Sequence, residues 1–392
     1  MREFMQLLKR EFKMFFRNTT LMMVFLGAPL IYAVMLASVY KSGKVTNIPI
    51  LVVDGDNSPM SLQLIEMLED NEGLSVVRVL PESTNIQSQM IDYNAVAVVE
   101  IPHRFEADVL QARYPEVNVY NNTVNLLTAN FAGKDIQVTL GTFAAGVEIK
   151  TLQKRGMPVP YSYQRYEPFK QNYIKVFNET GNYFTFMWPA MLAVVLQQVI
   201  LLAMAVSIAF EVENNTFGMG IVSKTKSAIS TVLVKVFPLW ILSIPLVFIF
   251  YLFHLYYNAP LPTHPINYVI MTGFFVVATT FLGTMISALL PNALKATQVL
   301  MVMSAPGFII GGYTWPLESM ALPIQWLASS LPLTPFLESF KLMLMQDATL
   351  SQVTPQMIHL VIQIVIYFAI SLLLVKWRIN REAKKMKYMQ RS

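Results

Sequence analysis

Long apolar runs alternate with polar segments along the chain, and the lengths of these runs predict which segments cross a membrane. The hydrocarbon core of a bilayer is about 30 Å thick, so a spanning helix needs roughly 20 mostly apolar residues. Six stretches are long and apolar enough, at about 19–40, 183–210, 229–253, 267–290, 294–312 and 356–377. The pattern therefore predicts an α-helical membrane protein with six transmembrane helices, five of them grouped in the region 183–377.

The segment before the first apolar run has apolar residues at helical spacing. Within "REFMQLLKREFKMFFR", residues 2–17, one helical face carries Phe4, Leu8, Phe12 and Phe15, and basic side chains lie on another face. Residues 1–18 are therefore predicted to form an amphipathic helix that lies in the membrane interface. The alternative is the start of a signal peptide with 21–36 as its apolar core, which the long apolar run without a small-residue cleavage site disfavours.

The region 41–182 has a different pattern, in which strands alternate with helices. Short β-type runs occur at 48–53, 74–80, 95–101 and 117–121, and helical patterns at about 58–70, 83–93, 103–112 and 123–154. This alternation predicts an inserted α/β domain with a small, mostly parallel or mixed sheet. "DGDNSP", residues 54–59, is expected to be a strand-to-helix turn with local side-chain hydrogen bonds rather than a metal or nucleotide loop.

Lysine and arginine in the short flanks predict the orientation, because they favour the cytoplasmic side. They concentrate before the first span, in the loop 211–228 and in the basic tail 378–392, whereas 313–355 carries only Lys341. Both ends of the chain are therefore expected in the cytoplasm and 41–182 outside, since long translocated domains are exempt from this rule. The expected location is the inner (cytoplasmic) membrane, with several passes.

Composition narrows the chemistry. Hydrophobic residues make up 54% of the chain and charged residues 14%, against about 25% charged in soluble domains. The chain has no cysteine and four scattered histidines, so we expect neither thiolate chemistry nor a metal site. The net charge of +5 does not indicate nucleic acid, because many of the basic residues flank apolar spans. No G-x-x-x-x-G-K-[ST] sequence occurs, so no cofactor is expected on this chain.

The apolar spans carry polar residues that are mostly uncharged. No Asp, Glu, Lys or Arg is expected deep inside a span, whereas carriers driven by protons or sodium normally need buried ionisable groups. If the protein is a transporter, its energy must therefore come from elsewhere. The uncharged polar residues are expected to join helices by hydrogen bonds or to line a pathway, and the pathway candidates are Gln197, Gln198, Thr280 and Gln298.

The stretch "FEVENNTFGMGIVSKTKS", residues 210–227, interrupts the spans with a short polar and then mildly apolar piece. Its asparagines and threonine are suited to capping a helix, and its carboxylates suit the positive end of such a helix. Two interpretations follow from the residues alone. The stretch is either a rigid element that docks in a groove on a soluble partner or a capped loop at the membrane interface.

Several motifs resemble those of one family. "EVENNT" is similar to its E-R-E-x-G-T pattern at Glu211, Glu213 and Thr216, although Asn215 replaces the glycine. "GGYTWPLESMALPIQWLASSLPLTPFLES", residues 311–339, is similar to its outer re-entrant segment. Over essentially its whole length, the chain resembles the permease subunit of ABC-2 type exporters, in the branch with a large extracytoplasmic domain after the first transmembrane helix.

The resemblance implies a transport subunit that is not itself an enzyme, driven by a separate cytoplasmic ABC ATPase that binds ATP and Mg. The ATPase would dock at the cytoplasmic coupling loop 211–228, and the outer re-entrant segment 313–345 would form the outer gate. The implied coupling residues are Glu211, Glu213, Asn214, Thr216, Phe217 and Ile221. The implied gate residues are Trp315, Pro316, Leu317, Glu318, Pro332 and Glu338.

The implied function is the export of an amphipathic small molecule, such as a drug, or of a lipid-like cargo by alternating access. The expected partners are a second permease copy, identical or paralogous, membrane lipids and a periplasmic membrane-fusion protein. The competing interpretation is a membrane-anchored signalling or scaffold protein whose outer domain binds a ligand. Within transport, a further alternative is mechanical work on an outer partner without movement of cargo.

Overall fold

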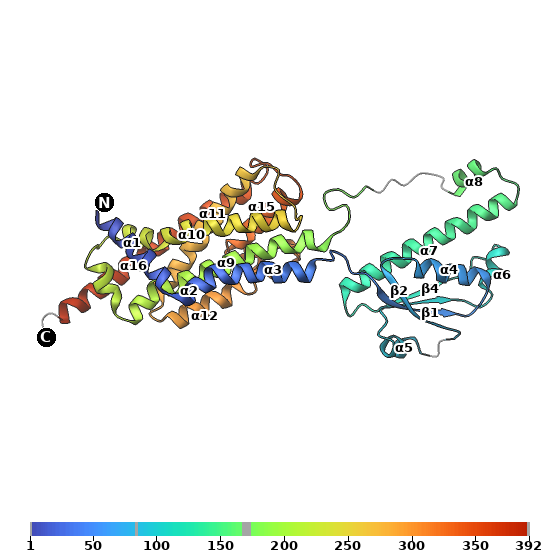
Figure 1. The fold of residues 1–392 in the computed structure, drawn as a ribbon, viewed down its shortest axis with the longest axis horizontal. Coiled ribbons are helices and arrows are strands. Elements are labelled where there is room, and N and C mark those ends of the chain that lie inside the picture. The colour runs from blue at the N-terminus through green and yellow to red at the C-terminus, as the bar shows by residue number, and fades with distance from the viewer. Residues whose placement is uncertain (1, 83–84, 167–173, 390–392) are drawn as a thin grey trace. The chain divides into compact units, whose positions relative to one another are not determined.

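The computed structural model describes residues 2–82, 85–166 and 174–389 (Figure 1). The chain divides into two compact units. One unit contains residues up to Gly43 together with those from Lys175 onward, and the other spans Lys44–Ile174. Parts of four sequence predictions, residues 1, 83–84, 167–173 and 390–392, lie outside the described residues.

The first unit contains the predicted apolar helices. Within the described residues, six helices are long and apolar enough to cross a membrane: Thr19–Tyr40, Tyr183–Glu213, Ala228–Tyr256, Pro265–Leu289, Ala293–Ile310 and Thr354–Lys387. The prediction of six such helices is therefore confirmed. The sixth helix, α16, runs from Thr354 to Met389, so the expected tail after residue 377 is, as far as it is described, a continuation of this helix.

Helix α1, Arg2–Arg17, precedes the first span, which consists of α2 (Thr19–Met22), a π-helical turn η1 (Met23–Gly27) and α3 (Ala28–Tyr40). The next spans are α9 (Tyr183–Glu213), α10 (Ala228–Tyr256) and α11 (Pro265–Leu289). A π-helical turn, η2 (Gly218–Val222), lies between α9 and α10. The fifth span is broken at Pro306 into α12 (Ala293–Ser304) and α13 (Gly307–Ile310). The predicted re-entrant segment contains η3 (Leu317–Ser319), α14 (Leu322–Ser329) and α15 (Leu333–Met345).

Helix α9 is the centre of this unit, because it packs against α3, α11, α12 and α15. Its Trp188 is fully buried and donates a hydrogen bond from Nε1 to the carbonyl of Ala33, 2.9 Å away. On its other side, the hydroxyl of Ser287 in α11 donates to Ala205 O and accepts from the N–H groups of Ile208 and Ala209. Hydrogen bonds between helices therefore supplement the apolar packing around α9.

The second unit is a mixed α/β fold. Its four strands are β1 (Ile48–Asp54), β2 (Leu74–Leu80), β3 (Ala97–Ile101) and β4 (Asn118–Asn121). They form one sheet in the order β2-β1-β3-β4, in which β1 is parallel to both of its neighbours and β4 is antiparallel to β3. The helices are α4 (Pro59–Glu69), α5 (Ile86–Asp92), α6 (Phe105–Leu110), α7 (Leu126–Lys154) and α8 (Val159–Tyr166).

Side chains alternate across this sheet, so each face has its own core. Ile50 and Val52 pack with residues of α4 and α7 on one face. Leu51 and Val53 pack with residues of α5 on the other face. The small mixed sheet expected from the alternating strand and helix patterns is therefore present.

The stretch 54–59 forms the predicted turn. Asp54 accepts hydrogen bonds from the N–H groups of Asp56 and Asn57 and from the hydroxyl of Ser61. Ser58 and Ser61 complete a capping box at the start of α4. Burial alone would raise the pKa of Asp56, but hydrogen bonds from Ser58 and from the backbone N–H groups of residues 104–106 lower this pKa below its usual value.

We predict that the close approach of α9 and α11 requires glycine at position 283. A Cβ atom there would lie 2.5 Å from the Cβ of Met204, so Gly283→Ala should force the helices apart and lower the free energy of unfolding by about 1–3 kcal/mol. Thermal unfolding in detergent, followed by tryptophan fluorescence, measures this effect. Gly273→Ala is the matched control on the same helix, where a Cβ meets nothing within 4 Å, and equal destabilisation of both variants would contradict the prediction.

Candidate functional site

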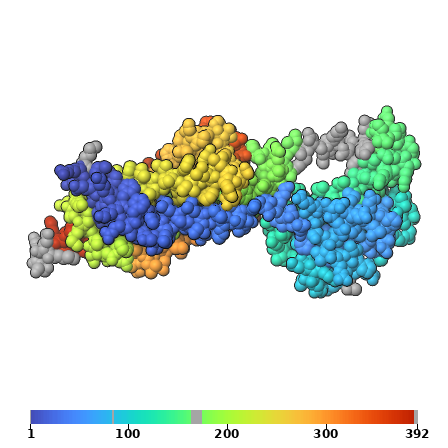
Figure 2. Space-filling model, viewed as in Figure 1, coloured from blue at the N-terminus to red at the C-terminus, as the bar shows by residue number. Residues whose placement is uncertain are grey.

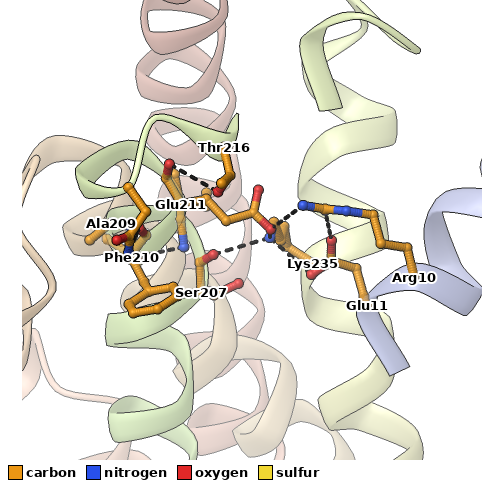
Figure 3. A network of polar contacts seen from close by, with 11 residues as sticks. Arg10, Glu11, Ser207, Ala209, Phe210, Glu211, Thr216 and Lys235 are labelled. Carbon is orange, nitrogen blue, oxygen red and sulfur yellow. Dashed lines mark hydrogen bonds and ion pairs between the residues drawn. The ribbon is translucent and has the colours of Figure 1, made fainter. Parts of the chain in front are cut away.

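Four charged side chains converge where α1, α9 and α10 meet (Figure 3). Arg10 and Glu11 come from α1, Glu211 from the last turn of α9, and Lys235 from about two turns into α10. We call these four residues the charge cluster. It joins segments that are more than 200 positions apart in the sequence, since Lys235 pairs with Glu11 across a separation of 224 residues.

Lys235 is the centre of the charge cluster. Its Nζ donates to Glu11 Oε2 at 2.9 Å, to Glu211 Oε1 at 3.0 Å and to the backbone carbonyl of Ser207 at 3.0 Å. These three acceptors match the three N–H donors of an ammonium group. Arg10 completes the cluster, with Nη1 2.6 Å from Glu11 Oε1 and Nη2 2.7 Å from Glu211 Oε1.

Three of the four side chains in the charge cluster are buried, and Arg10 is half-buried. The side chains of Lys235 and Glu211 are 1% and 0% exposed. Two positive and two negative charges sum to zero, which offsets part of the cost of removing each charge from water. Oε2 of Glu211 is buried and has no hydrogen-bond partner among the described residues. The carboxylate of Glu211 is therefore held through its other oxygen by two cations.

The local sequence explains how α1 brings Glu11 inward. Leu7, Leu8, Glu11 and Phe15 are the buried residues of this helix, and their spacing of three or four places them on one face. Glu11 is thus a carboxylate within an otherwise apolar stripe. The sequence interpretation missed Arg10 and Glu11. The carboxylate within the apolar stripe is the sequence signal that could have identified the charge cluster.

No charged residue was expected deep inside a span, and Lys235, about two turns from the start of α10, is buried within the protein. The ammonium is tolerated because the protein, rather than lipid, surrounds it and supplies its acceptors. The expected position of Glu211 at the start of the loop 211–228 is corrected. Helix α9 continues to Glu213, and Glu211 faces the charge cluster.

The other predicted coupling residues have different environments. Phe217 and Ile221 are 0% exposed, so their apolar side chains pack inward and are not available to a partner in this conformation. Asn214 and Thr216 are exposed, and the hydroxyl of Thr216 donates to Glu211 O. Glu213 is exposed and binds the start of α12, because it accepts from Asn292 Nδ2 at 2.7 Å and from the Ala293 N–H at 3.0 Å.

One exposed residue of this loop was not among the predicted coupling residues. The side chain of Met219 in η2 is 73% exposed, between the buried Gly218 and the half-buried Gly220. A Cβ atom on Gly220 would lie 2.5 Å from Arg10 Nη2. The glycine therefore allows α1 to pass close to the loop, which is a packing role that the helix propensity of glycine does not reveal.

The predicted gate residues are divided between exposed and buried positions. Trp315, Pro316, Glu318 and Glu338 are exposed, Leu317 is half-buried, and Pro332 is buried. The nearby Tyr313 is 4% exposed and donates from its hydroxyl to Phe186 O in α9 at 2.6 Å. This contact ties the start of the segment to the central helix.

The predicted pathway residues also differ in their contacts. Thr280 accepts from Trp240 Nε1 at 2.9 Å, and Gln198 Oε1 accepts from Ser304 Oγ at 3.0 Å. These two residues therefore join neighbouring helices. Gln197 is 1% exposed, and its amide has no hydrogen-bond partner among the described residues. Gln298 is exposed on α12.

Comparison with known proteins identifies the class. The family model described as ABC-2 family transporter protein matches residues 19–373. The chain belongs to this family, and the resemblance inferred from its motifs is confirmed. It is a multi-pass membrane protein and a transport subunit rather than a catalytic chain, in a family that works with a partner ATPase. A comparison with curated proteins found no match.

We predict that loss of Lys235 destabilises the first unit. Lys235→Met removes the central cation and leaves Glu11 and Glu211 with only Arg10, which should cost about 3–5 kcal/mol of unfolding free energy. Adding Glu211→Gln should recover part of this loss, because the second change removes an uncompensated buried charge. Thermal unfolding in detergent is the measurement.

Lys224→Met is the control for the loss of one lysine, since Lys224 is exposed in the adjoining loop. It should leave the unfolding temperature nearly unchanged. Equal unfolding temperatures for Lys235→Met and the parent chain would show that the charge cluster does not stabilise the fold.

Proposed function

We propose that the chain is the permease subunit of an ATP-driven exporter that moves an amphipathic small molecule or lipid-like cargo. ATP and Mg bind to a separate cytoplasmic ATPase, which docks on the loop between α9 and α10. The observation that carries this proposal is the charge cluster, because it joins α1, α9 and α10 next to the point where α9 ends and that loop begins. A force on the loop can therefore reach α1, α9 and α10 together.

The loop is suited to conveying a force because its inner side is packed. Phe217 and Ile221 belong to the core of the first unit, and η2 packs against α16. Its outer side offers Asn214, Thr216 and Met219 to a partner. We assign the docking contact to these exposed residues. Glu211 acts inside the protein, where it couples α9 to α10, and Glu213 positions α12.

The proposed orientation places the charge cluster at the cytoplasmic end of the spans and the unit 44–174 outside. The support is the concentration of Lys and Arg in the flanks at one end of the spans. Alternating access would involve the segment 313–345 as the outer gate, with Gln197 and Gln298 on the pathway. We propose a second permease copy, identical or paralogous, and a periplasmic membrane-fusion protein as further partners.

A second function is supported by a cavity in the unit 44–174. It has a volume of about 630 Å³ and is lined by α6, α7 and neighbouring residues, among them Phe105, Tyr114 and Phe143. A cavity of this size fits a small ligand, so the unit could serve a membrane-anchored signalling or scaffold protein. The two functions can be distinguished by ATP hydrolysis. If hydrolysis by a partner ATPase depends on this chain, the result favours the exporter over the signalling or scaffold protein.

We predict that Met219→Glu weakens docking of the ATPase. Replacing an exposed apolar side chain by a carboxylate at the proposed contact should cost about 1–3 kcal/mol, which is roughly one to two decades in affinity. The measurement is ATP hydrolysis by the partner ATPase in vesicles that contain the permease. The permease alone should hydrolyse no ATP.

The matched control for this experiment is Leu110→Glu. Leu110 is 58% exposed on the unit 44–174, so this variant introduces the same charge away from the proposed contact and should stimulate hydrolysis normally. If Met219→Glu stimulates as strongly as Leu110→Glu, the ATPase does not dock at η2.

We predict that Ser88 and Lys226 lie on opposite sides of the membrane. Both are exposed, and the chain has no cysteine of its own, so Ser88→Cys and Lys226→Cys each supply a single label site. In cells whose outer membrane is permeable and whose inner membrane is intact, a maleimide that cannot cross the inner membrane should label Ser88→Cys alone. Both sites should react after the membrane is opened, and labelling of Lys226→Cys in intact cells would overturn the orientation.

A further inference from the structure

A cavity adjoins the charge cluster on the side of the first span. Its volume is about 560 Å³, and its lining comes from the end of α1, the start of the first span, α9 and α10. Glu11, Ser207 and Lys235 contribute to it, so it reaches the charge cluster. Figure 2 shows α1 and the first span, in dark blue, on the surface of the first unit, where surrounding lipid can approach them.

One end of this cavity is polar and basic. Arg17, Asn18, Thr19 and Thr20 line it at the junction between α1 and α2. Arg17 is exposed and forms no ion pair within the described part of the chain. The four groups of the charge cluster neutralise one another, so Arg17 supplies the net positive charge. The hydroxyl groups of Thr19 and Thr20 add hydrogen-bond donors.

The remaining wall of the cavity is apolar. Leu21 from the first span, Ala203, Val206 and Phe210 from α9, and Leu239 from α10 form it. One cavity thus combines a cationic, donor-rich end with an apolar wall that belongs to membrane-spanning helices. An amphiphile with an anionic head and a hydrocarbon chain has the matching distribution of charge and apolar surface.

The position of the cavity favours a phospholipid. The polar end coincides with the first residues of a span, which is where lipid head groups lie. We propose that this cavity binds one anionic phospholipid, with the phosphate at Arg17 and Thr20 and an acyl chain along Val206 and Leu239. A lipid with an added ammonium group is disfavoured, because that group would lie near Arg17.

The bound lipid would also hold α1 in place. Its head group would contact the end of α1, and its chain would contact α9 and α10, which are the elements that the charge cluster joins. This inference does not depend on the cargo or on the ATPase, since it needs only a membrane-inserted chain.

The test is lipid binding to the full chain in an uncharged detergent, followed by native mass spectrometry. Phosphatidylglycerol, phosphatidylcholine and inorganic phosphate are the three probes. The parent chain should bind one phosphatidylglycerol about tenfold more tightly than phosphatidylcholine, and inorganic phosphate should bind far more weakly than either lipid. Tight binding of inorganic phosphate would overturn the lipid assignment in favour of a free-anion site.

Two variants and one control locate the site. Arg17→Gln should reduce the affinity for phosphatidylglycerol about tenfold and remove the preference over phosphatidylcholine. Val206→Trp fills the apolar end and should weaken both lipids. Lys13→Gln removes one positive charge from the same helix, at an exposed position outside the cavity, and should keep the preference.

Each variant can contradict the proposal. An unchanged preference in Arg17→Gln, or an equal loss in Lys13→Gln, would show that lipid is attracted to the basic surface in general rather than to this cavity. Unchanged lipid affinities in Val206→Trp would show that no acyl chain occupies the apolar wall.

Discussion

The arrangement at one end of the spans depends on neutralising the ammonium of Lys235 inside the protein. A buried cation is stable only where several acceptors surround it, and here they come from α1 and α9. This requirement determines where α1 can lie, because Glu11 must face α10. Helix α1 is thereby fixed to α9 and α10, and the cavity beside the charge cluster is lined by all three helices.

The two ends of the central helices are held by different physical means. Buried charge holds one end, where Arg378 of α16 also donates from Nε and Nη2 to the carbonyls at the end of α11. Toward the other end, α9 and α10 are joined by rings, since the ring centroid of Trp188 in α9 lies 5.0 Å from that of His254 in α10. Charge-assisted hydrogen bonds therefore dominate the first end, whereas the second end combines ring contacts with the neutral hydrogen bond from Trp188 Nε1 to Ala33 O.

The sequence predicted the elements well because their signals are local. Apolar length identified the spans, and the alternation of strand and helix patterns identified the sheet. The charge cluster escaped prediction because its pairs are long-range, as between Arg10 and Glu211, and no local pattern specifies them. The burial of Phe217 and Ile221 could not be predicted for a related reason: apolar residues in a short loop do not reveal whether they meet a partner or the protein's own core.

The glycine at position 220 has a consequence for how this loop can change over evolution. Because the guanidinium of Arg10 occupies the space where a Cβ at position 220 would be, a larger residue at 220 requires this guanidinium to move. The loop and α1 are therefore coupled through this contact. A loop transplanted from another permease, with a better helix former at 220, would displace Arg10 from Glu211 unless the matching stretch of α1 were transferred with it.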